Sequence, residues 1–356
     1  MTSSTLRDVA VVASAQIQQR VIADRSEAEF ITPLINEARD AVGYSQADID
    51  FTCSGSSDFI AGQGFSFVAT IDGVGPVPPI AESHVEMDGA WALYEAWVKI
   101  QTGVADTALV YSYSKASPGN LREVLATQLD PYYLAPLWPD AFSIGGLQAR
   151  MLLDAGLITE EQMAAAAATS MANAVGNPSA VRSGTTSAEE LLASDYVVDP
   201  LRSHDLPAGA DGGIAVVLAA EDRARDVVDR PAWIRGLDHR IDSHQIGVRD
   251  LTKSPSVELA AAKAGVSNDK VDHAELHGAF TFQQLLLESA LGIDPETTAV
   301  NPNGGALAGN TMMAAGLMRI ADAANAVASG SADRAVAHAT SGPCLQQNLV
   351  CVLEGD

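Results

Sequence analysis

Gly89-Ala-Trp-Ala-Leu-Tyr-Glu-Ala-Trp-Val-Lys-Ile-Gln-Thr-Gly103 is the stretch that decides the fold, because its pattern returns later as Gly316-Leu-Met-Arg-Ile-Ala-Asp-Ala-Ala-Asn-Ala-Val-Ala-Ser-Gly330. Both pairs of glycines lie 227 residues apart. Each stretch is followed by a similar run, Val-Ala-Asp-Thr-Ala-Leu-Val after the first and Ser-Ala-Asp-Arg-Ala-Val-Ala after the second. The pattern therefore predicts a helix followed by a buried strand, twice over.

A second pair of segments supports an internal duplication. Residues 45–50 (Ser-Gln-Ala-Asp-Ile-Asp) match residues 267–272 (Ser-Asn-Asp-Lys-Val-Asp), 222 residues later. Strand-like runs alternate with alanine-rich helical patterns, which is typical of layered α/β folds. We therefore predict a pseudo-twofold βαβ duplication. The predicted strands include 9–14, 107–113, 213–219, 273–276 and 334–338, and the predicted helices include 31–42, 89–101, 160–175, 257–264 and 313–328.

Composition restricts the classes of function. The chain has 356 residues and a formal net charge of −24, which argues against a general nucleic-acid-binding or anionic-membrane surface. Three scattered cysteines (Cys53, Cys344 and Cys351) fit free thiols in a reducing compartment rather than a disulfide framework. The N-terminus carries no apolar signal core, and the C-terminus carries no peroxisomal address. The expected location is the cytoplasm, and no histidine cluster has metal-ligand spacing.

The middle of the chain differs from its two ends in amino-acid composition. Residues 117–140 are rich in proline and tyrosine, and residues 177–186 are polar. We therefore expect an inserted loop domain over 118–204 that lies across one end of the sheets. The N-terminal half is then formed by 1–117 with 205–230, and the C-terminal half by 231–356.

Five motifs resemble the thiolase superfamily, in particular the thiolase module of sterol carrier protein X and its bacterial lipid-transfer relatives. They lie in the order of that family along almost the whole chain. The motifs are 156–162 with 174–178, 198–201, 210–216, His277-Gly-Ala-Phe-Thr with 285–288, and Val300-Asn-Pro-Asn-Gly-Gly. The resemblance implies a duplicated five-layered αβαβα fold and activity on acyl-CoA thioesters. Coenzyme A would be part of the substrate, with no tightly bound cofactor.

The catalytic positions of the family are changed here. The nucleophilic cysteine of the family lies three residues before the glycine matched by Gly89, which places Glu86 there, or Met87 after a slip of one residue. Asn310 stands where the family has its activating histidine, and Ser341 stands where it has its second cysteine. Ordinary Claisen thiolysis is therefore disfavoured for this chain alone, because neither Glu86 nor Met87 can form an acyl-thioester.

The resemblance leaves His277 and the Asn301 turn in place. We predict Glu86, His84 and His277 as catalytic residues, with His277 helping to form an oxyanion site. Asn310, Ser341 and Asn301 are the predicted CoA-substrate contacts. Ordinary structural roles are the alternatives: Glu86 and Asp88 as caps of the helix that begins at Gly89, and His84 as a satisfied core or interface residue.

Two functions stay open at this point. A Glu86 buried in the nucleophile's place, with a raised pKa, would serve retro-aldol cleavage of a β-hydroxyacyl-CoA together with a small OB-fold partner. Resemblance to bacterial relatives suggests a steroid side chain as the acyl group. Alternatively, the chain is a non-catalytic partner of an intact thiolase-like paralogue in a homo- or hetero-oligomer. A pure lipid carrier is the weaker third reading, because no separate sterol-carrier domain follows.

Overall fold

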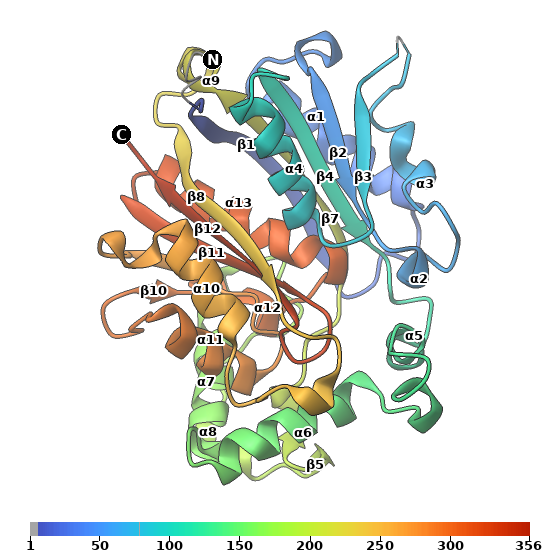
Figure 1. Ribbon diagram of the computed structural model, residues 1–356, viewed down its shortest axis with the longest axis vertical. Coiled ribbons are helices and arrows are strands. Elements are labelled where there is room, and N and C mark those ends of the chain that lie inside the picture. Colours follow the sequence, from blue (N-terminus) through green and yellow to red (C-terminus); the bar gives the residue numbers. More distant parts are fainter. Residues whose placement is uncertain (1–5, 78) are drawn as a thin grey trace.

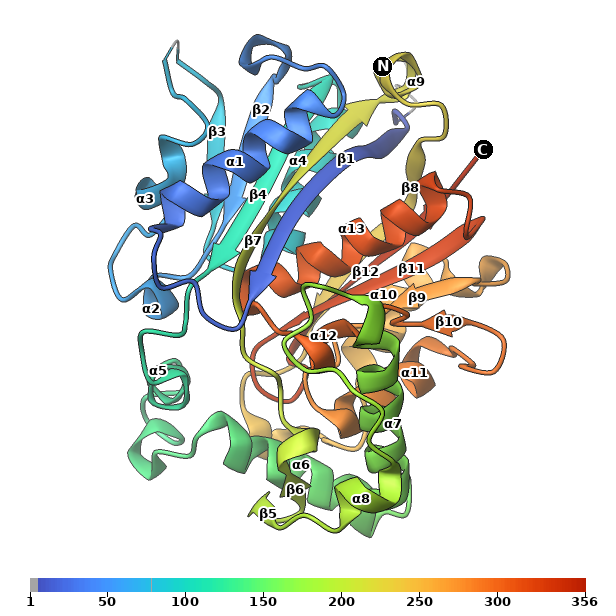
Figure 2. The same ribbon diagram turned by 180° about the vertical axis from the view of Figure 1, so that it is seen from behind.

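The computed structural model describes residues 6–77 and 79–356 and has two similar halves (Figures 1 and 2). In the N-terminal half the strands run in the order β3-β2-β4-β7-β1, and in the C-terminal half in the order β10-β9-β11-β12-β8. The strands are β1 (Val9–Gln19), β2 (Phe51–Gly55), β3 (Glu82–Val85), β4 (Thr107–Ser114), β7 (Asp211–Ala220), β8 (Ala232–Ile241), β9 (His273–Glu275), β10 (Ala299–Val300), β11 (Arg334–Ser341) and β12 (Gln347–Glu354).

The pairing directions also repeat. In each order, the first three strands pair in parallel with one another. The third strand then pairs antiparallel with the fourth, and the fourth antiparallel with the fifth. A short β1–β8 pairing at Ala10 and Val11 joins the halves into one ten-stranded sheet. The predicted duplicated α/β fold is therefore confirmed.

Two helices lie between the halves of the sheet. They are α4 (Gly89–Gln101) and α13 (Ala315–Ala328), the two helices that the repeated stretch predicts. Their apolar residues share one core with the inner faces of both halves of the sheet, from Val110 on β4 to Cys351 on β12. Burial of this alanine-rich surface is the main stabilising term for the central layer.

The outer faces are covered by further helices, which completes five layers. Helix α1 (Glu27–Asp40) packs against β1 and β7, while α10 (Pro255–Ala264) packs against β8 and β12. Helix α11 (Thr281–Leu291) packs beside α10. A capping box between Ser26 and Glu29 fixes the start of α1. The shorter helices outside the inserted segment are α2 (Asp58–Ala61), α3 (Val68–Ile71), α9 (Glu221–Val227) and α12 (Gly305–Ala308).

The segment 118–204 extends from the end of the molecule that is lowest in Figure 1. It contains α5 (Leu121–Thr127), α6 (Ala141–Asp154), α7 (Glu160–Asn173), α8 (Ala188–Leu192) and the hairpin of β5 (Tyr196–Val198) and β6 (Leu201–Arg202). Helix α7 packs on α11 and α12, so this segment contacts the C-terminal half. The domain boundaries given above stay a prediction.

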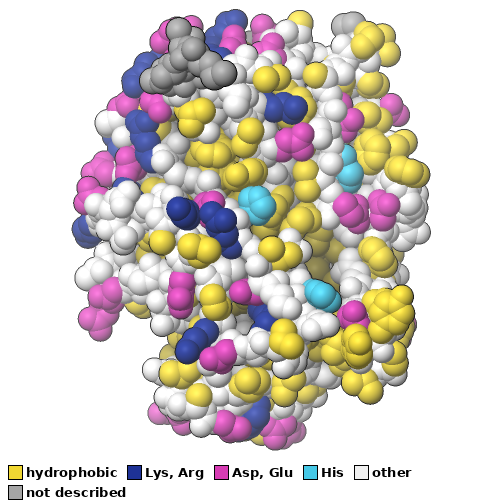
Figure 3. Space-filling model, viewed as in Figure 1, with side chains coloured by type: hydrophobic (Ala, Val, Ile, Leu, Met, Phe, Trp, Pro, Cys, Tyr) yellow, Lys and Arg dark blue, Asp and Glu magenta, His cyan; other side chains and the backbone are white. Residues whose placement is uncertain are grey.

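The surface agrees with the acidic composition. On the face drawn in Figure 3, lysine and arginine side chains are interspersed with aspartate and glutamate and form no continuous basic area. Within residues 6–77 and 79–356, no helix is both long and apolar enough to cross a bilayer. Location in the cytoplasm stays a prediction.

Candidate active site at the start of the central helices

The N-termini of α4 and α13 are held by matching close contacts. A Cβ on Gly89 would lie 2.5 Å from the Cβ of Ser112 on β4. A Cβ on Gly316 would lie 2.5 Å from the Cβ of Ala339 on β11. Both repeats thus need glycine because the start of the helix presses against the neighbouring strand. Such helix starts carry unpaired N–H groups and the positive end of the helix dipole.

One carboxylate, that of Asp88, binds both helix starts. Its Oδ1 accepts the N–H groups of Ala90 at 2.8 Å and Leu317 at 3.0 Å, and its Oδ2 accepts the N–H of Gly316 at 2.7 Å. Asp88 is only 1% exposed. Burial raises the pKa of its carboxyl to about 7. The three N–H groups act in the opposite direction and lower the pKa, but the effect of burial is larger.

The expectation that Glu86 is the buried acid is wrong. Its side chain is 46% exposed, while Asp88, two residues further on, points inward. Glu86 Oε1 accepts the N–H of Asp58, the first residue of α2, at 2.7 Å. Of the two carboxylates that the sequence places at the start of α4, Asp88 is the cap. Glu86 instead faces solvent at the end of edge strand β3.

His84 and Glu86 do come together, as their i, i+2 spacing predicts. His84 Nε2 lies 3.6 Å from Glu86 Oε2, and His84 Nδ1 lies 3.0 Å from the Oγ of Ser54 on β2. The imidazole stacks on Phe67 with ring centroids 4.8 Å apart. A Ser54 hydroxyl that donates to Nδ1 leaves the imidazole proton on Nε2, where it faces the Glu86 carboxylate. The arrangement can therefore orient a partly exposed base.

His277 is buried directly after β9. Its Nδ1 accepts the N–H of Thr340 at 3.4 Å, and its side chain is 5% exposed. Burial, together with the nearby His338 and Arg319, lowers the pKa of His277 to about 3. The imidazole is therefore neutral at pH 7, and acceptance at Nδ1 places its proton on Nε2. A neutral N–H donor of this kind can stabilise an oxyanion.

The three predicted substrate contacts have different environments. The side chain of Asn310 lies against His277, and its Oδ1 accepts the N–H of Met312 at 3.0 Å. Ser341 ends β11, next to the Thr340 that contacts His277. Asn301 is buried, and its carboxamide is bonded to the protein's own backbone rather than left free for a ligand. The structure thus places Asn310 beside His277, leaves Ser341 one residue from the Thr340 that contacts His277, and gives Asn301 another role.

The three thiols lie elsewhere. Cys53 is in β2 with its Sγ 3.8 Å from the Glu95 carboxylate, and Cys351 is in the middle of β12. Cys344 packs against the carbonyl of Ile144. Burial raises the pKa of all three, that of Cys344 to about 12. No thiolate is therefore available at the start of α4. Among the described residues, 6–77 and 79–356, no group of three or more His, Cys, Asp or Glu side chains is arranged to hold a metal ion.

The sequence did not predict three residues that lie at the candidate site: Asp88, Ser54 and Thr340. Asp88 could have been singled out, because it immediately precedes the first glycine of the repeated stretch. Ser54 and Thr340 carry no such signal. Their contacts arise from the parallel pairing of β2 with β3 and of β9 with β11, which brings residues 30 and 63 positions away beside them.

His338 gives the free energy of unfolding a pH dependence. Its Nε2 lies 3.0 Å from Asn348 Oδ1, and full burial lowers its pKa from 6.5 to about 4. The stabilisation is complete above pH 6.5 and is lost as pH falls toward 4, by roughly 3 kcal/mol. Replacing His338 with glutamine, which can still donate to Asn348, is expected to flatten this part of the curve. Urea unfolding at pH 4.5 and pH 7 measures the difference; an unchanged difference contradicts the assignment.

Comparison with known proteins agrees with this geometry. Residues 242–351 match the family described as "Thiolase, C-terminal domain". The acetyl-CoA acetyltransferase of Methanothermobacter thermautotrophicus is 26% identical over 297 residues, which cover 81% of this chain and 78% of that protein. The chain is thus similar to thiolases along most of its length, and its C-terminal part matches the thiolase family model. Its function therefore lies among the reactions of acyl-CoA compounds, and the resemblance stated from the five motifs is confirmed at this level.

Two further similarities concern proteins whose names describe bond cleavage. The 17-hydroxy-3-oxo-4-pregnene-20-carboxyl-CoA lyase of Mycobacterium tuberculosis is 24% identical to this chain over 293 residues, covering 75% of this chain and 74% of the lyase. A solved structure titled "Ltp2-ChsH2(DUF35) aldolase" has a TM-score of 0.79 at 20% identity and covers 99% of both chains. The structural likeness establishes the thiolase fold.

Proposed function

We propose that this chain catalyses retro-aldol cleavage of a β-hydroxyacyl-CoA, next to the thioester. The observation that carries the proposal is the neutral, buried His277, which holds an N–H donor beside Thr340 of β11 and Asn310, while no thiolate is available at the start of α4. The names of the lyase and aldolase relatives support the same reaction class. A steroid side chain is the acyl group we propose, following the name of the lyase.

The reaction needs a base and an oxyanion donor. The Glu86 carboxylate, oriented by His84, takes the proton of the β-hydroxyl, and the C–O bond becomes a carbonyl. The Cα–Cβ bond breaks, and its electron pair moves into the thioester to give an enolate whose oxygen accepts the Nε2–H of His277. The proton held by Glu86 then returns to Cα. The products are a carbonyl compound and a shortened acyl-CoA, and no free CoA is consumed.

Glu86 is tested by the isosteric change to glutamine. We expect Glu86→Gln to lower the cleavage rate about 100-fold, because loss of a general base typically costs at least this much. The assay uses the chain co-purified with a small OB-fold partner, on a 17-hydroxy-steroid acyl-CoA, without added CoA. Asp72→Asn is the control, since Asp72 is an exposed carboxylate at the end of α3, in the same half of the molecule. Unchanged cleavage by the Glu86 variant removes Glu86 from the mechanism.

A non-catalytic partner subunit is the second candidate, and the surface around β3 favours it. Strand β3 is the last strand of the sheet and has no further strand on its outer side in the described part of the chain. Three apolar side chains beside it are half-exposed or more: Phe59 at 50%, Phe65 at 73% and Val68 at 55%. Such a surface is typical of contact with another subunit. Cleavage that requires free CoA and an intact thiolase paralogue would support this candidate and overturn the retro-aldol proposal.

A further inference from the structure

The backbone just before His277 is held by a side chain. Strand β9 ends at Glu275, yet Leu276 continues its hydrogen-bond ladder through the carboxamide of Asn301. Asn301 Oδ1 accepts the N–H of Leu276 at 2.7 Å, and its Nδ2 donates to the carbonyl of Leu276 at 3.2 Å. The carboxamide thus replaces a neighbouring strand for one residue. The direction in which His277 leaves the sheet depends on this pairing.

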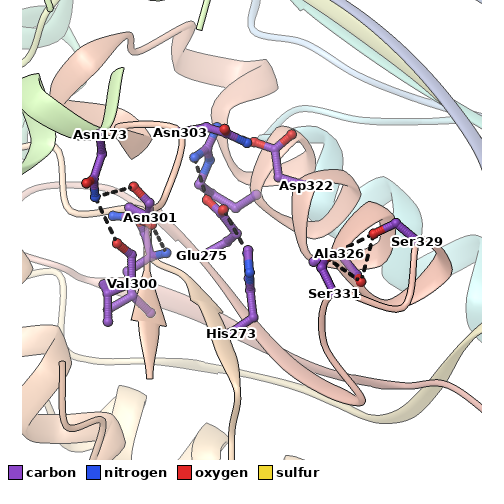
Figure 4. A network of polar contacts seen from close by, with 12 residues as sticks. Asn173, His273, Glu275, Val300, Asn301, Asn303, Asp322, Ala326, Ser329 and Ser331 are labelled. Carbon is purple, nitrogen blue, oxygen red and sulfur yellow. Dashed lines mark hydrogen bonds and ion pairs between the residues drawn. The ribbon is translucent and has the colours of Figure 1, made fainter. Parts of the chain in front are cut away.

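The turn that carries Asn301 is in turn held by the end of α7. Figure 4 shows Asn173 donating from Nδ2 to the carbonyls of Val300 at 3.5 Å and Asn301 at 3.1 Å. Ser170 donates to the carbonyl of Gly304 at 2.6 Å, and Asn177, just beyond the helix, donates to that of Asn303 at 3.0 Å. Three polar side chains of the inserted segment therefore bind the backbone carbonyls of one turn in the C-terminal half.

The two glycines of the turn are explained by the same contacts. A Cβ on Gly305 would lie 2.5 Å from Asn301 Nδ2, so that any side chain there displaces the carboxamide. A Cβ on Gly304 would lie 2.7 Å from the Cβ of Ala174 and 3.1 Å from the carbonyl of Ser170, so that it would push α7 away. Both glycines also have positive φ, at +95° and +59°. The two glycines of the Asn-Pro-Asn-Gly-Gly sequence thus leave room for the Asn301 carboxamide and for the end of α7.

The other side of the same backbone is fixed independently. Glu275 is fully buried and binds Arg319 Nη1 of α13 at 2.7 Å and His273 Nε2 at 3.0 Å. The segment from Glu275 to His277 is therefore rigid on the α13 side. Its hydrogen-bonded link to the inserted segment runs through Asn301, while Leu276 also shares an apolar core with Leu152 and Met163 of that segment.

We propose that Asn173 and Asn301 are positioning residues, which make the orientation of His277 depend on how the inserted segment sits on the C-terminal half. When α7 is seated, Asn173 holds the turn, Asn301 holds Leu276, and His277 keeps Nε2–H free. When α7 shifts, the carboxamide releases Leu276 and the imidazole turns from Thr340. The inference rests on the proposed function only for what His277 does to the substrate.

The test reads His277 directly, by nitrogen-15 NMR of histidine-labelled full chain across a pH titration. Wild-type protein should show the Nε2-protonated tautomer of His277 without titration above pH 4. Asn301→Ala should give a tautomer mixture and raise the pH midpoint of His277 by about one unit or more, because water reaches the ring. Asn173→Ala, at a less buried position, should give a smaller shift in the same direction. Asn301→Asp retains the acceptor for Leu276 and should fall between wild type and Asn301→Ala.

Thr298→Val is the matched control. Thr298 donates a buried hydrogen bond to the carbonyl of Val271 at 3.0 Å, at the opposite end of the β9–β10 pair. Its loss should lower stability similarly and leave the signals of His277 unchanged. Wild-type signals in both asparagine variants, or an equal shift in Thr298→Val, overturn the inference. The readout needs no turnover, so a failed cleavage assay would leave the result intact and would count against the proposed function alone.

Discussion

Replacing Asp88 with alanine is expected to lower the free energy of unfolding by roughly 4 kcal/mol or more. The change removes one acceptor from three buried N–H groups, those of Ala90, Gly316 and Leu317. No water can replace it without space, since Gly316 and Gly89 are packed against strands there. The change also removes two hydrogen bonds between the halves, because Asp88 lies in the N-terminal half and its donors Gly316 and Leu317 lie in the C-terminal half.

Equilibrium unfolding in urea, followed by circular dichroism at pH 7.5, measures this effect. Asp130→Ala is the matched control, because the Asp130 carboxylate also accepts two N–H groups, those of the exposed residues Tyr132 and Tyr133. Its loss should cost only about 1 kcal/mol, since water can satisfy the donors. A loss below 1 kcal/mol for Asp88→Ala would mean that the carboxylate does not join the helix starts.

The repeated stretch was sufficient to predict the central layer. Helix α4 begins and ends at the residues that the pattern gives, Gly89 and Gln101, because the spacing of alanine and the flanking glycines act locally. Helix α13 starts two residues later than predicted, at Ala315, since Met312 takes a positive φ of 50° in the turn before it. Strand β1 runs on to Gln19, beyond the predicted end, because its polar residues still pair with β7.

Side-chain direction could not be predicted in the same way. Glu86 and Asp88 are both acids before one helix, and only contacts about 228 residues away along the chain decide that Asp88 is the buried one. Asn301 was assigned to the substrate through its motif, yet a motif gives a position and not the direction of a carboxamide. The contact between His84 and Glu86, in contrast, follows from strand geometry alone.

A buried charge network provides the second large effect. Arg319 lies in α13, is nearly buried, and binds both Glu275 at 2.7 Å and Asp322 at 2.8 Å. Burial raises the pKa of Asp322 to about 6, against the opposing effect of Arg319. Gln16 of β1 donates to Asp322 at 2.9 Å, so the network reaches from the C-terminal half into the N-terminal half. In Figure 4, Glu275 lies between His273 on one side and Asp322 on the other.

Arg319→Met is expected to destabilise the protein by about 3–5 kcal/mol, because it leaves two buried carboxylates without their cation. Combining it with Glu275→Gln removes one of these charges and should recover about 2 kcal/mol of the loss. Arg225→Met is the control, since its partner Asp356 and Arg225 itself are exposed, and it should cost less than about 1 kcal/mol. Wild type, the three single variants Arg319→Met, Glu275→Gln and Arg225→Met, and the double variant are compared by urea unfolding at pH 7.5. If the double variant is as unstable as the two single losses added together, the pair does not act as one buried unit.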